Sequence, residues 1–131
     1  MQHINILMVD DHPIIIEGYQ NTLMATKNDD QVLVIDTANN CDTANELLQK
    51  ASKEKPYDVC FFDISLPSSS DGSITSGEDL AKIARDILPN AKIIIVTGYI
   101  DENLQKDEVT AVFSKPCNLE EIVQLIKSEI C

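Results

Sequence analysis

The stretch Tyr57-Asp58-Val59-Cys60-Phe61-Phe62-Asp63 decides the fold of this 131-residue chain. Its β-branched and aromatic residues favour a strand. A continuous apolar run this short is typical of a strand that is buried on both faces of a parallel sheet. The run stops at a carboxylate, Asp63. Ligands of open α/β sheets bind at the carboxyl ends of the strands, so we expect Asp63 to lie at the floor of a site.

Strand and helix patterns alternate along the rest of the chain. Strands are predicted at residues 4–9, 31–36, 57–63, 91–96 and 110–114. Helices are predicted at 13–25, from Asp42 or Thr43 to about 53, at 77–88, over a short stretch at 101–106, and from Asn118 onward. This alternation predicts an α/β fold with helices on both faces of a parallel sheet. We expect a flavodoxin-like, doubly wound, five-stranded sheet with strand order 2-1-3-4-5.

The first predicted helix carries an apolar stripe that should face the core. It begins at Pro13, which suits the first turn of a helix. The stripe comprises Ile14, Ile15, Gly18, Tyr19, Leu23 and Met24. We expect all of these positions to be buried.

Composition limits the function classes. The formal net charge is −12 and 44% of residues are hydrophobic. This predicts a folded single domain over residues 1–131 and argues against direct nucleic-acid binding, which depends on clustered Lys and Arg. The four cysteines show no Cys-x-x-Cys spacing, which favours a reducing cytoplasm. We find neither a signal peptide nor a membrane-spanning run.

Polar residues stand at, or directly after, the carboxyl ends of four of the five predicted strands. They are Asp10 and Asp11, Asp63, Thr97, and Lys115. Three neighbouring carboxylates repel one another unless a cation binds or one takes a proton, and hard oxygen ligands select Mg²⁺. A carboxylate can also act as a nucleophile and form an aspartyl-phosphate. A neighbouring lysine and hydroxyl would then bind the phosphoryl oxygens.

These residues resemble the receiver domain of bacterial two-component response regulators. The matching motifs are Asp10-Asp11, Asp63-Ile64-Ser65-Leu66-Pro67, Thr97-Gly98 and Lys115-Pro116, each directly after a predicted strand. Asp10-Asp11-His12-Pro13 with Gly18 is most similar to receivers that precede helix-turn-helix output domains. The resemblance extends over nearly the whole chain.

The resemblance implies a role for each matching residue. Asp63 would be the phospho-acceptor. Asp11 would bind Mg²⁺ directly, Asp10 directly or through water, and the Ser65 carbonyl would complete the protein ligands. The switch hydroxyl and the partner of the phosphoryl group would be Thr97 and Lys115, with a cis bond before Pro116.

The resemblance also implies a signalling domain rather than an enzyme. It would catalyse only its own phosphorylation and dephosphorylation, with a histidine kinase or phosphotransfer protein as its partner. It leaves open an output domain or partner protein outside this chain and a phosphorylation-dependent dimer. No membrane partner is implied.

Three departures from the family pattern bear on the output. The loop at 68–76 is longer than usual, and its composition predicts flexibility rather than catalysis. The stretch from Thr97 to Lys115 is short. Val112 stands where the family commonly has an aromatic switch residue. We therefore expect the turn at 98–101 and the loop at 68–76 to change most on phosphorylation.

Several alternatives stay open at this point. A flavin-binding module would need a phosphate-cradling loop after the first strand, where this chain has two acids. A phosphohydrolase could use Asp63 as its nucleophile. A receiver with weakened switching could serve as a docking or phosphate-sink module. His12 follows the acids, but no second His or Cys has suitable spacing, so we interpret it as part of the helix start.

Overall fold

A computed structural model describes residues 2–26, 29–64, 66–97 and 111–114. In chain order the elements are β1 (Gln2–Val9), α1 (Pro13–Thr26), β2 (Gln31–Ala38), α2 (Cys41–Lys53), β3 (Val59–Asp63), α3 (Gly77–Ile87), β4 (Lys92–Thr97) and β5 (Ala111–Ser114). The predicted helices at 101–106 and from Asn118 lie outside the described residues. Within the described ranges, no helix has both the length and the apolar character that a membrane span requires.

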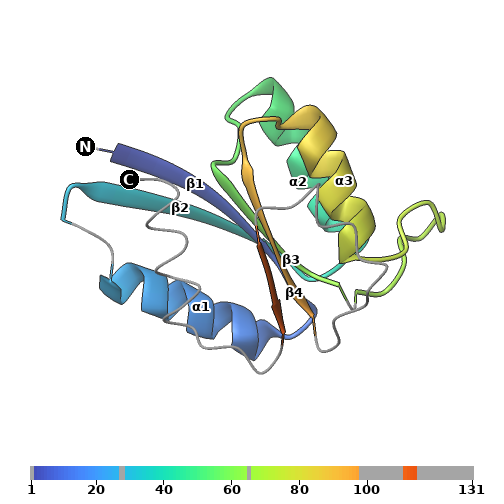
Figure 1. Ribbon diagram of the computed structural model, residues 1–131, viewed down its shortest axis with the longest axis horizontal. Coiled ribbons are helices and arrows are strands. Elements are labelled where there is room, and N and C mark those ends of the chain that lie inside the picture. Colours follow the sequence, from blue (N-terminus) through green and yellow to red (C-terminus); the bar gives the residue numbers. More distant parts are fainter. Residues whose placement is uncertain (1, 27–28, 65, 98–110, 115–131) are drawn as a thin grey trace.

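The five strands form one parallel sheet in the order β2-β1-β3-β4-β5. This confirms the predicted α/β class and strand order. Helix α1 covers one face of the sheet, while α2 and α3 cover the other (Figure 1). The carboxyl ends of β1, β3 and β4 lie along the lower edge in that view, where α1 begins. The polar residues that follow these strands are therefore brought to one edge.

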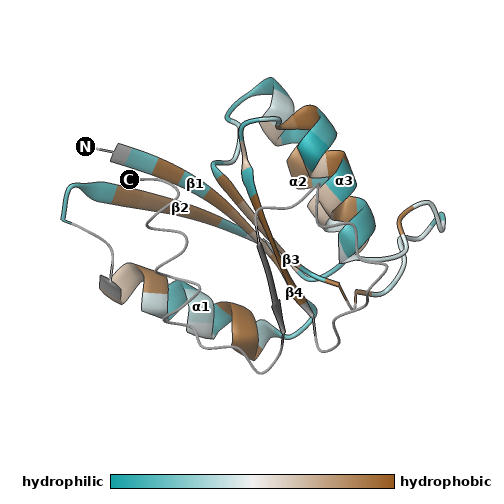
Figure 2. Cartoon of the chain, viewed as in Figure 1, coloured by the Kyte–Doolittle hydropathy of each residue, from teal (hydrophilic) through white to brown (hydrophobic). Residues whose placement is uncertain are grey.

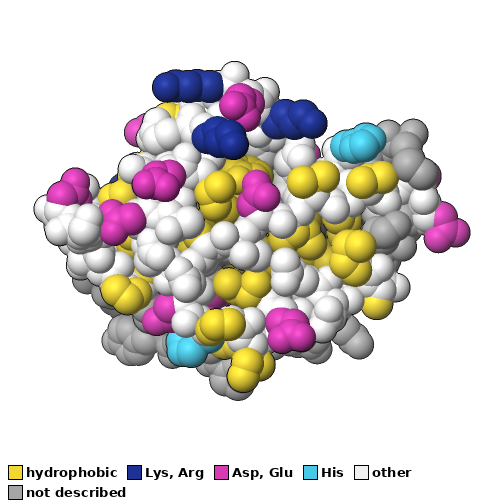
Figure 3. Space-filling view, turned by 180° about the vertical axis from the view of Figure 1, so that it is seen from behind, with side chains coloured by type: hydrophobic (Ala, Val, Ile, Leu, Met, Phe, Trp, Pro, Cys, Tyr) yellow, Lys and Arg dark blue, Asp and Glu magenta, His cyan; other side chains and the backbone are white. Residues whose placement is uncertain are grey.

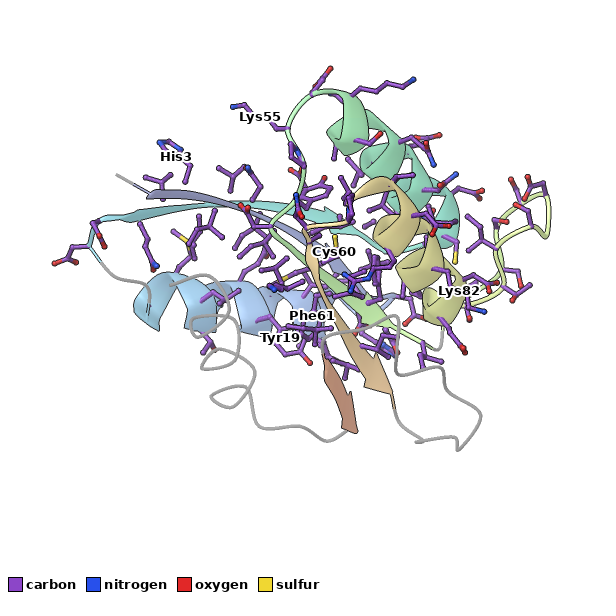
Figure 4. The ribbon with its side chains drawn as sticks, turned by 45° about the horizontal axis from the view of Figure 1, so that its top comes forward. His3, Tyr19, Lys55, Cys60, Phe61 and Lys82 are labelled. Carbon is purple, nitrogen blue, oxygen red and sulfur yellow. The ribbon has the colours of Figure 1, made fainter. Side chains whose placement is uncertain are left out.

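Strand β3 is buried along its whole length. Its side chains alternate between the two faces, as the strand period of two requires. Phe61 packs edge-on against Tyr19 of α1, with ring centroids 4.7 Å apart, whereas Cys60 lies in the core on the side of α2 and α3 (Figure 4). Cys60 is fully buried and therefore packs as a small hydrophobic residue, and burial raises the pKa of its thiol to about 12. Figure 2 shows β1, β3 and β4 coloured mostly as hydrophobic, between the helices that cover the two faces of the sheet.

The predicted stripe on α1 is partly wrong. The buried face is centred on Ile16, Tyr19 and Leu23, whereas Ile14 is 83% exposed and Met24 is 49% exposed. Positions 16, 19 and 23 share one face at 3.6 residues per turn, and Ile14 lies on the opposite side of the helix. Docking against the sheet, and not apolar character alone, decided which isoleucines are buried.

Helix α2 begins before the predicted caps. Asn40 is the N-cap residue, and its side chain accepts a hydrogen bond of 2.8 Å from the backbone N–H of Thr43. Asp42 and Thr43 therefore lie inside the first turn. All three residue types cap helices well, so composition could not decide between them. Strand β2 likewise runs two residues beyond its predicted end, to Ala38.

The segment at 66–76 is a loop, as predicted, but hydrogen bonds and a buried side chain fix it. Two hydrogen bonds between Ser69 and Ile74 close it. The Ser69 N–H donates to the Ile74 carbonyl at 2.7 Å, and the Ile74 N–H donates to Ser69 Oγ at 3.0 Å. Ser70 donates to the Asp42 carboxylate of α2, and Ile74 is buried in the core beside α2 and α3. These contacts argue against the flexibility that the serine-rich composition predicts.

Candidate functional site

Three carboxylates meet at the carboxyl edge of the sheet. Asp10 and Asp11 follow β1 directly, and Asp63 is the last residue of β3. One ligand atom from each of these residues, together with one from His12, lies within 4.8 Å of all the others. We call Asp10, Asp11 and Asp63 the acid cluster. The structure thus brings together three of the residues that the sequence predicted at this site.

The acid cluster is largely withdrawn from water. Asp63 is 1% exposed and Asp10 is 2% exposed, while the Asp11 side chain is 33% exposed. The Oδ1 atom of Asp11 is nevertheless shielded from solvent, with the Nδ1 atom of His12 2.9 Å away. Buried carboxylates this close together repel one another strongly unless a cation or a proton intervenes. Both the donor set and this shielded oxygen fit a hard divalent cation.

Backbone hydrogen bonds fix the chain where it leaves β1. The backbone N–H of Asp10 donates to Ala38 at the end of β2, at 3.1 Å. Two residues later, the His12 carbonyl accepts from Ile15 at 3.0 Å and from Ile16 at 3.3 Å, which begins α1. Asp10 and Asp11 therefore lie between two fixed elements.

His12 contacts both neighbouring acids. Its Nδ1 atom lies 2.9 Å from Asp10 Oδ1 and 2.9 Å from Asp11 Oδ1. Its backbone N–H also donates to Asp10 Oδ1 at 2.9 Å. The interpretation of His12 as merely part of the helix start missed these contacts. Its position directly after two acids was the signal, because a turn at that point folds the ring back onto them.

The other side of the site is formed by the start of α3. The Gly77 N–H donates to the Ile64 carbonyl at 3.2 Å, and Ile64 in turn donates to Val96 of β4 at 3.1 Å. An added Cβ at Gly77 would overlap the backbone carbonyl of Asp63. Helix α3 thus rests directly on the backbone of Asp63. Sequence reasoning assigned Gly77 only to the start of a helix.

The remaining predicted site residues are placed only in part. Asp63 pairs with Val96 in the sheet register, so the backbone of Thr97 lies one residue beyond the level of Asp63 on the adjacent strand. Thr97 also pairs with Ser114, the last residue of β5. Ser65 and Lys115 lie outside the described residues.

The chain matches the response regulator receiver domain family over residues 6–127. The transcriptional regulatory protein ComA of Bacillus subtilis (strain 168) is 30% identical over 125 residues, which cover 92% of this chain and 53% of ComA. The chain therefore spans about half the length of that relative.

Solved structures resemble the fold over almost all of its length. A CheY-like receiver domain protein from Methanospirillum hungatei JF-1 has a TM-score of 0.77 at 24% identity, covering 98% of this chain and 94% of its own. TrrA from Thermotoga maritima, solved in complex with Mg(2+)-BeF, has a TM-score of 0.74 at 29% identity, and the match covers 97% of this chain and 99% of TrrA. TrrA in complex with the histidine kinase ThkA has a TM-score of 0.73 at 28% identity, and the match covers 98% of this chain and 99% of TrrA. Because the family match covers most of the chain and includes Asp10, Asp11 and Asp63, this chain belongs to the receiver domain family of two-component response regulators.

Proposed function

We propose that the chain is a single receiver domain over residues 1–131, in which Asp63 accepts a phosphoryl group from a histidine kinase in a Mg²⁺-dependent reaction. One observation carries the proposal. Asp63 is buried at the end of the central strand, and its ligand oxygen lies within 4.8 Å of those of Asp10 and Asp11. TrrA, which is similar over 97% of this chain, was solved with Mg(2+)-BeF, and this supports the same use of the site here.

Asp10, Asp11 and Asp63 would hold the metal, together with the backbone carbonyl of Ser65. When bound, Mg²⁺ neutralises the mutual repulsion of the carboxylates and attracts the oxygens of the incoming phosphoryl group. Water or carbonyl oxygens fill the remaining positions of such an ion. The acid cluster without a cation would repel that group.

A carboxylate oxygen of Asp63 would attack the phosphorus of a phosphohistidine. The new P–O bond forms as the P–N bond breaks, and the imidazole of the donor leaves with the bonding electrons. We assign the Thr97 hydroxyl and the Lys115 ammonium to the phosphoryl oxygens, where a donor and a positive charge would stabilise them. The burial of Asp63 would strengthen these charge interactions and limit hydrolysis of the acyl phosphate.

The proposed partners are a histidine kinase or phosphotransfer protein and a transcriptional output. TrrA forms a complex with the histidine kinase ThkA, and ComA is a transcriptional regulatory protein. With a net charge of −12, this domain is poorly suited to bind DNA itself, so the output would be delivered by a separate domain or partner. The buried free thiols Cys41 and Cys60 fit a reducing cytoplasm, where we place the protein. A phosphorylation-dependent dimer stays a prediction.

Intact mass spectrometry after incubation with acetyl phosphate tests the assignment. Wild type with Mg²⁺ should gain one phosphoryl group, and it should gain none when a chelator removes the metal. Asp63→Asn should gain none under either condition. Asp86→Asn, which removes an exposed acid on α3, is the matched control and should label like wild type.

Three results would contradict the proposal. Equal labelling of Asp63→Asn would move the acceptor to another residue. Steady turnover of p-nitrophenyl phosphate without a lasting adduct would favour the phosphohydrolase alternative. An unlabelled wild type that still binds Mg²⁺ would favour the docking module.

A further inference from the structure

The ring of His12 lies where a metal ligand would lie. Its Nδ1 atom is 2.9 Å from Asp10 Oδ1 and 2.9 Å from Asp11 Oδ1, and a nitrogen of the ring belongs to the same four-atom group as an oxygen of Asp63. In an octahedral site with bonds of about 2.1 Å, adjacent ligand atoms are about 3.0 Å apart and opposite ones about 4.2 Å apart. The two distances from Nδ1 match the spacing of adjacent ligands. The whole group, within 4.8 Å, is close to the span of one coordination shell.

The backbone holds His12 at this position. Its N–H donates to Asp10 Oδ1, and its carbonyl begins α1 by accepting from Ile15 and Ile16. The residue that precedes a proline is further restricted to extended conformations, and Pro13 follows His12. The ring is anchored by these contacts although 60% of its side chain is exposed. It reaches the acids without a rearrangement of the backbone.

We propose that His12 is a fourth protein ligand through Nδ1 and that it shifts the metal preference of this site towards divalent transition ions. Carboxylate and carbonyl oxygens suit Mg²⁺, whereas imidazole suits ions such as Ni²⁺ and Co²⁺. In this structure Nδ1 faces two carboxylate oxygens, which can only accept, so Nδ1 carries the proton and donates to them. On metal binding the cation would take the place of that proton, and the ring would bind as the neutral tautomer that carries its proton on Nε2. A site with three carboxylates and one imidazole would bind Mg²⁺ through its oxygens and would bind Ni²⁺ more tightly than an all-oxygen site does.

The second histidine of the chain provides an internal control. His3 lies near the start of β1, at the opposite end of the sheet from the acid cluster (Figure 4). The histidine side chains visible in Figure 3 lie at opposite rims of the face. A variant at His3 removes an exposed imidazole without touching the site.

Titration calorimetry of the full chain with NiCl₂ and with MgCl₂ tests the proposal. In His12→Gln the amide can still donate to the acids, but the imidazole is gone. We expect its Ni²⁺ affinity to fall at least ~10-fold and its Mg²⁺ affinity to change less than ~3-fold. His3→Gln should bind both ions like wild type. Asp11→Ala should weaken both, which confirms that the measured site is the acid cluster.

Other outcomes overturn the inference. Equal changes in affinity for the two ions in His12→Gln would mean that the ring does not shift the metal preference. An unchanged Ni²⁺ affinity would mean that the ring moves aside when a cation binds. If His12→Gln fails to fold, the same comparison with His12→Asn and the Co²⁺ absorption spectrum of wild type decide the point, because a bound imidazole changes that spectrum. The inference rests on the metal site and not on phosphorylation of Asp63. No phosphodonor is present, so failure here and failure of Asp63 labelling are separate results.

Discussion

The Cα atom of Gly77 approaches the backbone carbonyl of Asp63 so closely that an added Cβ would overlap it. The same added atom would lie 3.0 Å from the Cα of Ile64. These neighbours are backbone atoms at the end of β3 and directly after it, and they cannot turn aside as a flexible side chain can. The start of α3 and the proposed phospho-acceptor are therefore packed as one unit.

Gly77→Ala should be strongly destabilising for this reason. The helix or the end of β3 must shift to admit a methyl group, and we expect a loss of about 2–4 kcal/mol in the free energy of unfolding. Urea denaturation measures it. Gly72→Ala is the matched control, because Gly72 has a φ of +74° but open space around it. That variant should lose only about 1–2 kcal/mol from backbone strain. A smaller loss at Gly77 than at Gly72 would contradict the packing argument.

Asp11→Ala should separate metal binding from folding. Removing one member of the acid cluster takes away a metal ligand but also relieves repulsion between close carboxylates. We expect Mg²⁺ affinity to fall at least ~10-fold, while stability in the presence of a chelator rises by about 1 kcal/mol. Calorimetry and urea denaturation give the two quantities. Asp86→Ala removes the same charge from an exposed position and should change neither. Unchanged Mg²⁺ binding in Asp11→Ala would exclude it as a ligand.

Ile74→Ala should show that the serine-rich loop belongs to the core. Ile74 is 5% exposed and packs in the cluster beneath α2 and α3. We expect its truncation to cost about 2–4 kcal/mol. Ile14→Ala, at a position that is 83% exposed, should have a free energy of unfolding within about 0.5 kcal/mol of wild type. Thermal or urea unfolding checks the pair. Equal stability of the two variants would restore the prediction of a flexible loop.

Asp79 should make the join between this loop and α3 sensitive to acid. Its carboxylate accepts from the Thr75 N–H at 2.8 Å and from the Thr75 hydroxyl at 2.7 Å. The backbone bond first, and then the hydroxyl, lower the pKa of Asp79 below its ordinary 3.8. A pKa that is lower in the folded state stabilises folding above pH 3.8, and this contribution is lost as the pH falls through the folded value.

Asp79→Asn should therefore lower the free energy of unfolding by about 0.5–1 kcal/mol at pH 7. The difference in this free energy between the variant and wild type should become smaller below pH 3.8. Thermal unfolding between pH 7 and pH 3 follows this difference. Glu78→Gln, in the same turn, removes a charge without touching Thr75 and separates the hydrogen bonds from the helix dipole. If the difference in stability between Asp79→Asn and wild type grew as the pH fell, the predicted direction of the pH dependence would be wrong.

Local sequence patterns predict some features of this fold and leave no sign of others. The strand order and the meeting of Asp10, Asp11 and Asp63 follow from alternating periodicities and from strand ends, which a single chain displays. The buried face of α1, the Asn40 cap and the ordered loop depend on partners far along the chain, such as Asp42 holding Ser70. The contacts of His12 and Gly77 were missed because they arise from close backbone approach, which leaves little trace in composition.

The backbone around Asp63 also indicates which segment should respond to phosphorylation. The loop at 66–76 begins at Leu66, whose N–H donates to the Ile64 carbonyl at 2.9 Å, and it is followed by Gly77, whose N–H donates to the same carbonyl. Both ends of the loop are therefore fixed to the residue that follows Asp63. A population shift requires contacts that differ between two states, and a phosphoryl group on Asp63 would change the charge beside this junction.

We therefore expect the loop, together with the turn at 98–101 outside the described residues, to change most when Asp63 carries a phosphoryl group. Val112 has no aromatic ring and little rotamer freedom, so it cannot make the inward swing of the usual switch residue. Hydrogen exchange with and without beryllofluoride and Mg²⁺ measures the response. The amides of Gly72 and Ile74, which bond to Ser69 within the loop, should change protection. Asp63→Asn is the control and should show no change. If protection changed mainly at residues 112–126 while both loops stayed the same, the usual switch would operate and this expectation would be wrong.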